Sequence, residues 1–322
     1  MKGNIQKVIK EIHDRRSFSV TAHVNPEADA MGSSLALAWS LRQLGKQAQV
    51  VSQDPLPKIL AFLPHEGILT QMTEIQAPPD ALFVLDCGDI ERTGFFDGQK
   101  RPSFPVINID HHVTNKQFGT VNWVDPDAAA TAELIYDLDL ELGVDLTPEI
   151  AICLYTALVS ETGFFAYSNT SPKVLRIAAE LIDLGVDPWT VAQKLRENSM
   201  GRLHLLGELL LGLQQTPDGK IAWVTVTQDH FKKTGTTAED LEEFVGYPRS
   251  LKGVEVALLI REINLETCKV SFRSRDRVDV AALAQQFGGG GHQKAAGCTI
   301  KGGLKEVEAR VIQVVKKVLL SS

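Results

Sequence analysis

The sequence predicts an α/β protein: an N-terminal parallel sheet with helices on both faces, a helical connector, and a smaller α/β domain with a mixed sheet. Three observations predict this architecture. Continuous apolar runs alternate with helical patterns in the first part of the chain, as in strands that are buried on both faces. Polar residues follow these runs directly, at the sheet edge where open parallel sheets bind ligands. After a Leu-rich stretch, the pattern changes to further strands followed by helices.

The first part of the chain contains the parallel sheet and its helices. We expect strands at 18–21, 49–51, 81–85 and 105–109, and helices at 4–14, 30–44, 128–142, 148–159 and 172–184. Gly45 and Gly185 end two of these helices. A helical stretch, 188–219, ends in the turn sequence TPDG and forms the connector. Beyond it we expect strands at 221–227, 254–260 and 268–272, and helices at 280–287 and 304–320.

The length of 322 residues, 44% of them hydrophobic, favours two domains. We place these domains at 1–187 and 220–322, on either side of the connector at 188–219. The charged fraction of 23% and the aromatic fraction of 7% are those of an ordinary globular protein and exclude a disordered chain.

The charge is unevenly distributed along the chain. The whole sequence has 33 basic and 40 acidic side chains and a formal net charge of −7. Residues 220–322 contain 16 of the basic and 12 of the acidic ones, which leaves 17 and 28 for residues 1–219. This balance excludes a uniformly basic surface for nucleic acid but allows a basic second domain. Chance scatter of surface charge is the alternative explanation.

The cysteines and the N-terminus predict a reduced, soluble, cytosolic protein that has no membrane partner. None of the four cysteines forms a C-x-x-C pair, so a disulfide framework or a zinc ribbon is not expected. The N-terminal stretch is charged and lacks the apolar core of a signal peptide. No run of 18 apolar residues is present that could span a bilayer.

Four short polar clusters contain the candidate catalytic residues. They are HVNPEAD at 23–29, DCGD at 86–89, DHH at 110–112 and SETG at 160–163. The first three come after apolar strands, and the fourth ends an apolar helix. Taken singly, each has a structural explanation: Asp29 could cap its helix, and His23 could be a hydrogen-bonded loop residue.

Taken together, the clusters indicate a metal site. They supply two imidazoles and four carboxylates, namely His23, Glu27, Asp29, Asp86, His111 and Glu161. Four carboxylates in one place repel each other unless cations are present. Two divalent ions would relieve the repulsion, and a set of His and carboxylate ligands without thiolates suits Mn²⁺, and also Mg²⁺ or Zn²⁺. Two such ions, roughly 3.5–4 Å apart, stabilise an in-line phosphoryl displacement.

A fifth motif, FGGGGHQKAAG at 287–297, favours phosphate binding. Successive glycines allow a ligand to approach the backbone closely and expose N–H groups to phosphate oxygens. Arg273 and Arg275 lie just upstream at a predicted strand end, where guanidinium groups suit bidentate phosphate contacts. A flexible glycine linker is the alternative, although Ser and Pro are missing from the run.

These motifs, in this order, resemble those of the DHH-family phosphoesterases. The matching segments are HVNPEADAMGS, VLDCGD, NIDHHVTN, LVSETGFFAYSNT and GGGGHQKAAG, and they cover the whole chain. The length and the two-domain layout are similar to the nanoRNase/pAp-phosphatase subgroup. The resemblance implies hydrolysis of short oligoribonucleotides, pAp, or linear and cyclic dinucleotides. A homodimer is implied by the resemblance alone.

The resemblance also implies a role for each site residue. One metal would be held by His23, Glu27 and Asp86, and the other by Asp29, Asp86, His111 and Glu161, so that Asp86 bridges the two. His112 would contact the scissile phosphate, and Asp110 would orient a histidine. The far end of the substrate would be gripped by Arg273, Gly289, Gly290, Gly291 and His292.

The sequence departs from the family pattern in two places. Glu27 and Glu161 stand where the family most often has Asp, and the longer side chain shifts the reach of each ligand. Phe164, Phe165 and Ala166 follow Gly163, where the subgroup often has an Arg. This second difference bears more on the choice of substrate than on catalysis.

Two other functions remain open from the sequence. A nucleotide-binding regulator with an impaired metal site would explain the departures from the family pattern. A hydrolase of pyrophosphate or polyphosphate would use a similar metal site, although the Gly-rich motif with His292 favours a nucleoside end.

Overall fold

The computed structural model describes residues 2–75, 78–97, 102–241, 243–291 and 293–321. The chain forms two compact units, Met1–Glu197 and Asn198–Ser322. The stretch predicted as a connector contains helix α6 (Pro188–Leu195) in the first unit and α7 (Met200–Leu211) in the second. The proposed limits at 187 and 220 remain a prediction. None of the described helices is both long and apolar enough to cross a membrane.

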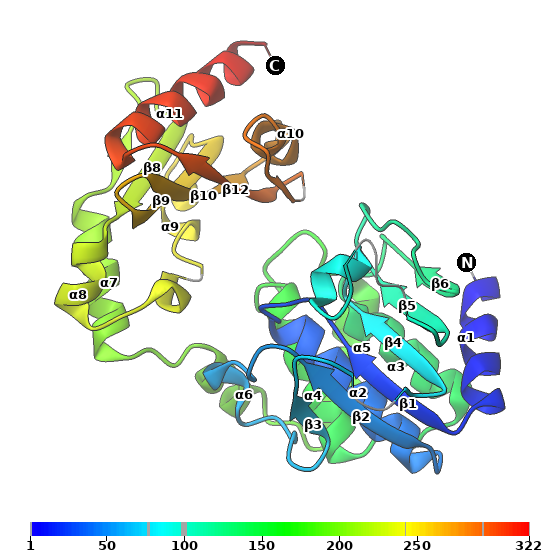
Figure 1. Ribbon diagram of the computed structural model, residues 1–322. Coiled ribbons are helices and arrows are strands. Elements are labelled where there is room, and N and C mark those ends of the chain that lie inside the picture. The colour runs from blue at the N-terminus through cyan, green and yellow to red at the C-terminus, as the bar shows by residue number, and fades with distance from the viewer. Residues whose placement is uncertain (1, 76–77, 98–101, 242, 292, 322) are drawn as a thin grey trace. The chain divides into compact units, whose positions relative to one another are not determined.

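The first unit contains the predicted parallel sheet. Its described strands lie in the order β3-β2-β1-β4-β5-β6, and every pairing is parallel (Figure 1). The strands are β1 (Ser17–Thr21), β2 (Gln47–Ser52), β3 (Leu69–Gln71), β4 (Ala81–Leu85), β5 (Val106–Asp110) and β6 (Val121–Val124). The sequence did not predict β3 and β6, which lie at the two edges and have no continuous apolar run.

Helices flank this sheet. They are α1 (Lys2–Asp14), α2 (Ala28–Gln43), α3 (Thr131–Leu142), α4 (Pro148–Glu161), α5 (Pro172–Asp183) and α6, with short 3-10 turns η1 (Lys58–Leu60) and η2 (Ile90–Thr93). Phe83, Leu85 and Ile107 pack in one core with side chains of α2, α3 and α4. Leu82 and Val84 point to the opposite face, against η2 and neighbouring loops. Both faces of the central strands are therefore covered, as their apolar sequences predict.

The sheet topology brings the polar clusters together. β4 lies between β1 and β5, and all three run in the same direction. His23 follows β1 by two residues, Asp86 follows β4 directly, and Asp110 is the last residue of β5. Because the carboxyl ends of neighbouring parallel strands meet at one edge, these side chains converge there.

The second unit has the predicted mixed sheet. Its described strands lie in the order β11-β12-β10-β9-β8-β7, with β8 and β9 parallel and the other pairs antiparallel. They are β7 (Gln214–Gln215), β8 (Ile221–Val226), β9 (Val256–Asn264), β10 (Thr267–Ser274), β11 (Gly290–Gly291) and β12 (Ala295–Lys301). The sequence did not predict β12, because this strand begins with Ala-Ala-Gly, which does not alternate apolar and polar residues.

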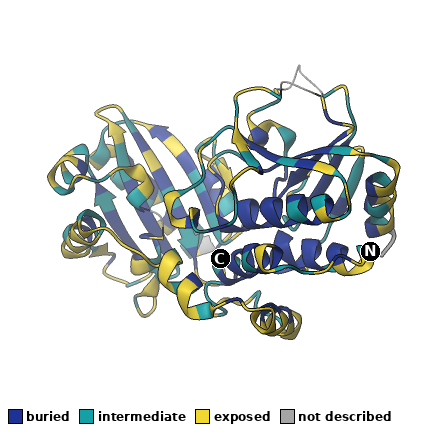
Figure 2. Ribbon diagram, turned by 90° about the horizontal axis from the view of Figure 1, so that it is seen from below, coloured by how far each residue is buried: buried dark blue, intermediate teal, exposed yellow. Residues whose placement is uncertain are grey.

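Two helical layers cover this second sheet. One core contains α10 (Val280–Gln285) and α11 (Leu304–Ser321), and the other contains α7, α8 (Gln228–Thr234) and η3 (Ala238–Leu241). The short helix α9 (Gly246–Ser250) contacts β9. The central strands of both units are largely dark blue in Figure 2, because helices and loops exclude solvent from them.

Candidate metal centre

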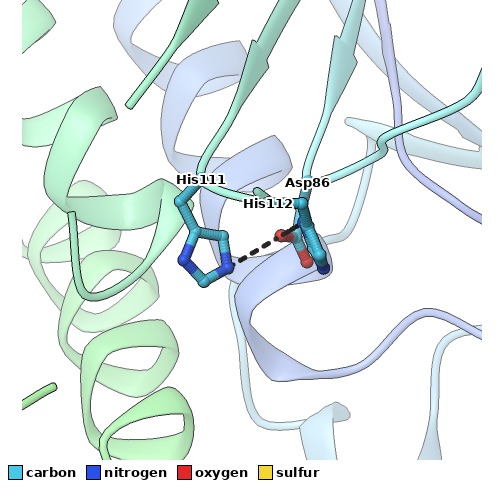
Figure 3. A group of neighbouring side chains, drawn as sticks. All are labelled: Asp86, His111 and His112. Carbon is cyan, nitrogen blue, oxygen red and sulfur yellow. Dashed lines mark ion pairs between the residues drawn. The ribbon is translucent and has the colours of Figure 1, made fainter. Parts of the chain in front are cut away.

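Asp86 is the centre of the polar cluster at the edge of the first sheet. The residue is buried and has a φ of 51°, in the left-handed region, where the chain leaves the extended conformation of β4. Its Oδ1 lies 3.5 Å from Nε2 of His111 and 3.5 Å from Nδ1 of His112. Its Oδ2 lies 3.8 Å from Nε2 of His23. Figure 3 shows the imidazoles of His111 and His112 beside this carboxylate.

The donor atoms fit a divalent ion. Two overlapping groups exist among the described residues, His23 with Glu27 and Asp86, and Asp86 with His111 and His112. Nε2 of His23 is 3.9 Å from Oε1 of Glu27. Two ligands of one ion can be at most about 4.2 Å apart, twice a bond of about 2.1 Å, so the distances between 3.5 and 3.9 Å are compatible with shared ions. Asp86 belongs to both groups.

Asp29 does not cap its own helix, contrary to the structural alternative drawn from the sequence. It lies in the first turn of α2, and its carboxylate instead faces the N-terminus of α3. Oδ2 accepts a hydrogen bond from the backbone N–H of Thr131 at 2.7 Å, and Oδ1 accepts from that of Ala132 at 3.0 Å and from the Ser33 hydroxyl at 2.9 Å. These bonds hold Oδ2 at 3.8 Å from Nε2 of His111.

Thr131 is a site residue that the sequence did not reveal. Its hydroxyl donates a hydrogen bond to Oδ1 of Asp86 at 3.1 Å, while its backbone N–H binds Asp29. The N-terminus of a helix carries partial positive charge, so α3 stabilises both carboxylates. The only sequence cue is a threonine after three alanines, and the backbone donors give no cue at all.

Asp110 orients the histidine pair. The imidazole Nδ1 of His112 donates to Oδ1 of Asp110 at 2.6 Å, and the backbone N–H of His111 donates to the same oxygen at 2.9 Å. The side-chain amide of Asn115 donates to Oδ2 of Asp110 at 2.6 Å and to Asn108 at 2.8 Å. Asn108, a polar residue between the apolar side chains of a buried strand, was the available cue to this network.

The ring of His111 is oriented by a backbone carbonyl group. The imidazole Nδ1 of His111 faces the carbonyl oxygen of Ala128 at 3.3 Å, which leaves Nε2 directed at Asp86. A hydrogen bond of this kind sets which ring nitrogen is available to a metal. His111 therefore presents one nitrogen to the carboxylates from the loop between β5 and β6, while Ala128 lies in the loop that leads into α3.

The cluster is electrostatically incomplete without cations. Burial, followed by the charges of Asp29 and Glu27, raises the pKa of Glu161 to about 9. Burial, followed by the charge of Asp86, raises the pKa of Asp29 to about 7. Asp86 is also buried, but its hydrogen bond to His111 and three nearby imidazoles hold its pKa well below the usual range. In the absence of cations, the raised pKa values favour the protonated forms of Asp29 and Glu161, which reduces the repulsion between the carboxylates.

The pKa of His111 is also raised, because the nearby carboxylates stabilise its protonated form. Burial lowers its pKa, but the hydrogen bond to Asp86 and the charges of Asp29 and Asp86 outweigh burial and raise the pKa to about 10. Asp29 and Glu161 belong to neither ligand group among the described residues. Asp29 still brings Oδ2 to 3.8 Å from Nε2 of His111, and the charge of Glu161 interacts with those of Asp29, Asp86 and His111.

The predicted substrate residues lie in the second unit. Arg273 is in β10, where its Nη1 donates to the carbonyl of Phe272 at 3.1 Å, and His292 lies outside the described residues. A Cβ on Gly289 would stand 2.2 Å from the Gly297 carbonyl oxygen, and one on Gly291 would stand 2.6 Å from that of Ala295.

Gly290 differs from its two neighbours. Among the described residues, no atom lies within 4 Å of the position that its Cβ would take. Packing against β12 therefore explains the glycines at 289 and 291 but not the glycine at 290.

The comparisons with known proteins agree with this architecture. Residues 17–158 match the model of the DHH family, N-terminal domain, and residues 218–320 match that of the DHHA1 domain. The bifunctional oligoribonuclease and PAP phosphatase NrnA of Thermus thermophilus is 39% identical over 301 residues, which are 93% of this chain and 89% of the relative. The protein of the same name from Bacillus subtilis is 30% identical over 282 residues, 86% of this chain and 87% of the relative.

A solved structure has the same fold over the full length. An exopolyphosphatase-related protein from Bacteroides fragilis superimposes with a TM-score of 0.89 and 26% identity, covering 100% of this chain and 96% of the other. Matches to both domain models and the long alignments with curated relatives confirm the resemblance seen in the motifs. The chain therefore belongs to the DHH family of phosphoesterases.

Proposed function

We propose that this protein is a two-metal phosphoesterase that hydrolyses short oligoribonucleotides and pAp. The observation that carries the proposal is one buried carboxylate at the carboxyl edge of a parallel sheet: Oδ2 of Asp86 lies 3.8 Å from His23, and its Oδ1 lies 3.5 Å from His111. The names of the Thermus and Bacillus relatives, oligoribonuclease and PAP phosphatase, support these substrates.

We assign the metal ligands as follows. One ion would be held by His23, Glu27 and Asp86, whose donor atoms form one group. The second would be held by Asp86 and His111 with Asp29, which lies 3.8 Å from His111, and with Glu161, whose charge interacts with those of Asp29, Asp86 and His111. When bound, the ions would supply positive charge to the reacting phosphoryl group and lower the pKa of a water molecule between them. The acid-rich set without a thiolate favours Mn²⁺ over Zn²⁺, since the thiol of Cys87 donates to the carbonyl of Asp89.

His112 has a separate role. Its Nδ1 donates to Asp110, which fixes the orientation of the ring, and the resemblance to the family implies that the ring contacts the scissile phosphate. Burial lowers its pKa, but the hydrogen bond to Asp110 and the charge of Asp86 outweigh burial and raise it above the usual value. The raised pKa favours the protonated ring, which would donate a hydrogen bond to a phosphate oxygen. Asp110 orients the ring without contacting substrate.

We further propose that Arg273, His292 and the glycines 289–291 of the second unit bind the substrate; Gly290 is the glycine that packing among the described residues does not explain. We also infer a homodimer in the cytosol, where four buried free cysteines remain reduced.

The direct test is a product profile with Mn²⁺ supplied. We expect hydrolysis of di- to pentaribonucleotides and of pAp, measured by chromatography of the products, and little release of phosphate from pyrophosphate or polyphosphate. The polyphosphate arm is needed because the Bacteroides relative is called exopolyphosphatase-related. Bound metals with no turnover of pAp, cyclic dinucleotides or short RNA would contradict the proposed activity, and retained nucleotide affinity would then favour a regulator.

Replacing Asp86 by Asn tests the shared ligand. The variant should lose more than about 100-fold in turnover and bind fewer than two metals per chain, because an amide is a poor bridging ligand. Asn tolerates the positive φ of this position, so the fold should survive. Metal content and kcat are the measurements. Glu91→Gln, an equal charge change at an exposed residue nearby, is the control and should leave both unchanged.

The affinity for metal should rise with pH. Folded pKa values of about 7 for Asp29 and about 9 for Glu161 exceed the ordinary values of 3.8 and 4.5, so their protonated forms stabilise the metal-free protein. That stability is complete below about pH 4 and is lost as the pH rises through 7 and 9. Metal binding displaces these protons, and affinity should increase about tenfold per pH unit for each proton displaced.

Calorimetry with Mn²⁺ at pH 6, 7 and 8 measures this dependence. The difference in Tm between metal-loaded and metal-free protein should widen over the same range. A metal affinity that does not change from pH 6 to 8 would show that metal binding displaces no protons from these carboxylates.

Gly290→Ala should separate substrate binding from packing. The new methyl group meets no described atom within 4 Å, so Tm should be unchanged, whereas KM for nucleotides should rise several-fold if phosphate approaches this backbone. Gly289→Ala is the matched variant, and its clash with Gly297 and Cys298 should lower Tm instead. An unchanged KM in the first variant would remove Gly290 from the substrate site.

A further inference from the structure

The turn that follows Glu161 has an unusual backbone. Gly163, Phe164 and Phe165 have φ values of 56°, 58° and 63°, three left-handed residues in succession. Bulky residues rarely adopt this conformation, because Cβ then approaches the following carbonyl oxygen. Such a turn persists only where its surroundings enforce it, and strained backbone of this kind collects at functional sites.

Hydrogen bonds tie the turn to the metal centre. The carbonyl of Thr162 accepts the backbone N–H of Tyr167 at 3.0 Å, which closes the turn on itself. The side-chain amide of Asn169 donates to the carbonyls of Glu161 and Ala129, both at 3.1 Å. Ala129 lies in the loop whose Ala128 carbonyl faces His111, so the turn and the histidine share one support.

Arg196 adds a contact from a distant part of the sequence. It is the C-cap residue of α6, the last helix of the first unit, and its guanidinium carbon lies 3.7 Å from the ring centroid of Phe164. Phe164 also packs against the main core of this unit. A planar guanidinium on an aromatic face combines electrostatic attraction with stacking, which an ammonium group cannot reproduce.

We propose that Arg196 is a positioning residue for the metal centre: by stacking on Phe164, it fixes the strained turn and thereby the carboxylate of Glu161. The proposal rests on the metal site of the proposed function. Glu161 is the last residue of α4, so its direction depends on how the chain leaves the helix. Because the chain passes from Arg196 into the second unit at Asn198, a displacement of this segment would be transmitted to Glu161.

The test measures metal binding and backbone protection, not activity alone. Arg196→Ala should weaken the binding of one of two Mn²⁺ ions roughly five- to tenfold in calorimetry, the size expected for a lost cation–π contact. In the metal-free protein, amide exchange should accelerate in residues 162–167. Phe164→Leu, which removes the ring but keeps apolar bulk, should weaken binding similarly, and the double variant should be no weaker than either single one.

Two further variants make the result decisive. Lys194→Ala removes an exposed charge from the same helix and should change neither readout. Arg196→Lys keeps the charge without the planar face and should not restore affinity. If Arg196→Ala binds Mn²⁺ as Lys194→Ala does, or if its effect and that of Phe164→Leu add fully, the proposal is overturned. A metal-loaded parent chain that hydrolyses no nucleotide would refute the proposed function but leave this comparison intact.

Discussion

The burial of Asp86 at the end of β4 is the constraint on which the first unit depends. A carboxylate in a sheet edge without water is costly unless it is paired or binds a metal. Here the Thr131 hydroxyl and three imidazoles approach it, and their combined effect keeps it ionised. The same arrangement leaves its neighbours Asp29 and Glu161 with raised pKa values. Neighbouring groups of the protein stabilise the negative charge of Asp86, whereas Asp29 and Glu161 require protons or cations.

Three helices of the first unit place the acidic side chains of this cluster and the backbone groups that bind them. α3 begins at Thr131 and directs two backbone N–H groups at Asp29, an interaction that in most proteins a residue of the same helix supplies. α2 brings Asp29 to that position, and α4 brings Glu161 as its last residue. The packing of three helices on one face of the sheet therefore also sets the direction of two acidic side chains.

Much of the fold and half of the site could be predicted because each had a side-chain pattern. The buried strands β4 and β5 are continuous apolar runs, and Asp86 and Asp110 interrupt them at their ends. Thr131, Asn108 and Asn115 could not be predicted in the same way, since their partners come from other elements and partly from backbone groups. The edge strands β3 and β6 were missed because each pairs with one neighbour only and needs no apolar run. The pattern of apolar residues shows which side chains are buried, but it does not show which strands pair with each other.

The distribution of charge now has a physical explanation. The acidic excess in residues 1–219, 28 acidic against 17 basic side chains, includes the carboxylates of the metal centre, which two divalent ions would reduce by about four charges. In the metal-free cluster, the raised pKa values of Asp29 and Glu161 already reduce the negative charge, and divalent ions would add positive charge that attracts a polyanionic substrate. Under the proposed function, metal would therefore contribute to substrate binding as well as to chemistry. The basic side chains of residues 220–322 do not depend on metal, and under the proposed function they would be a second source of attraction for the substrate. Removing the metal should therefore weaken substrate binding without abolishing it, which a site built from metals alone would not allow.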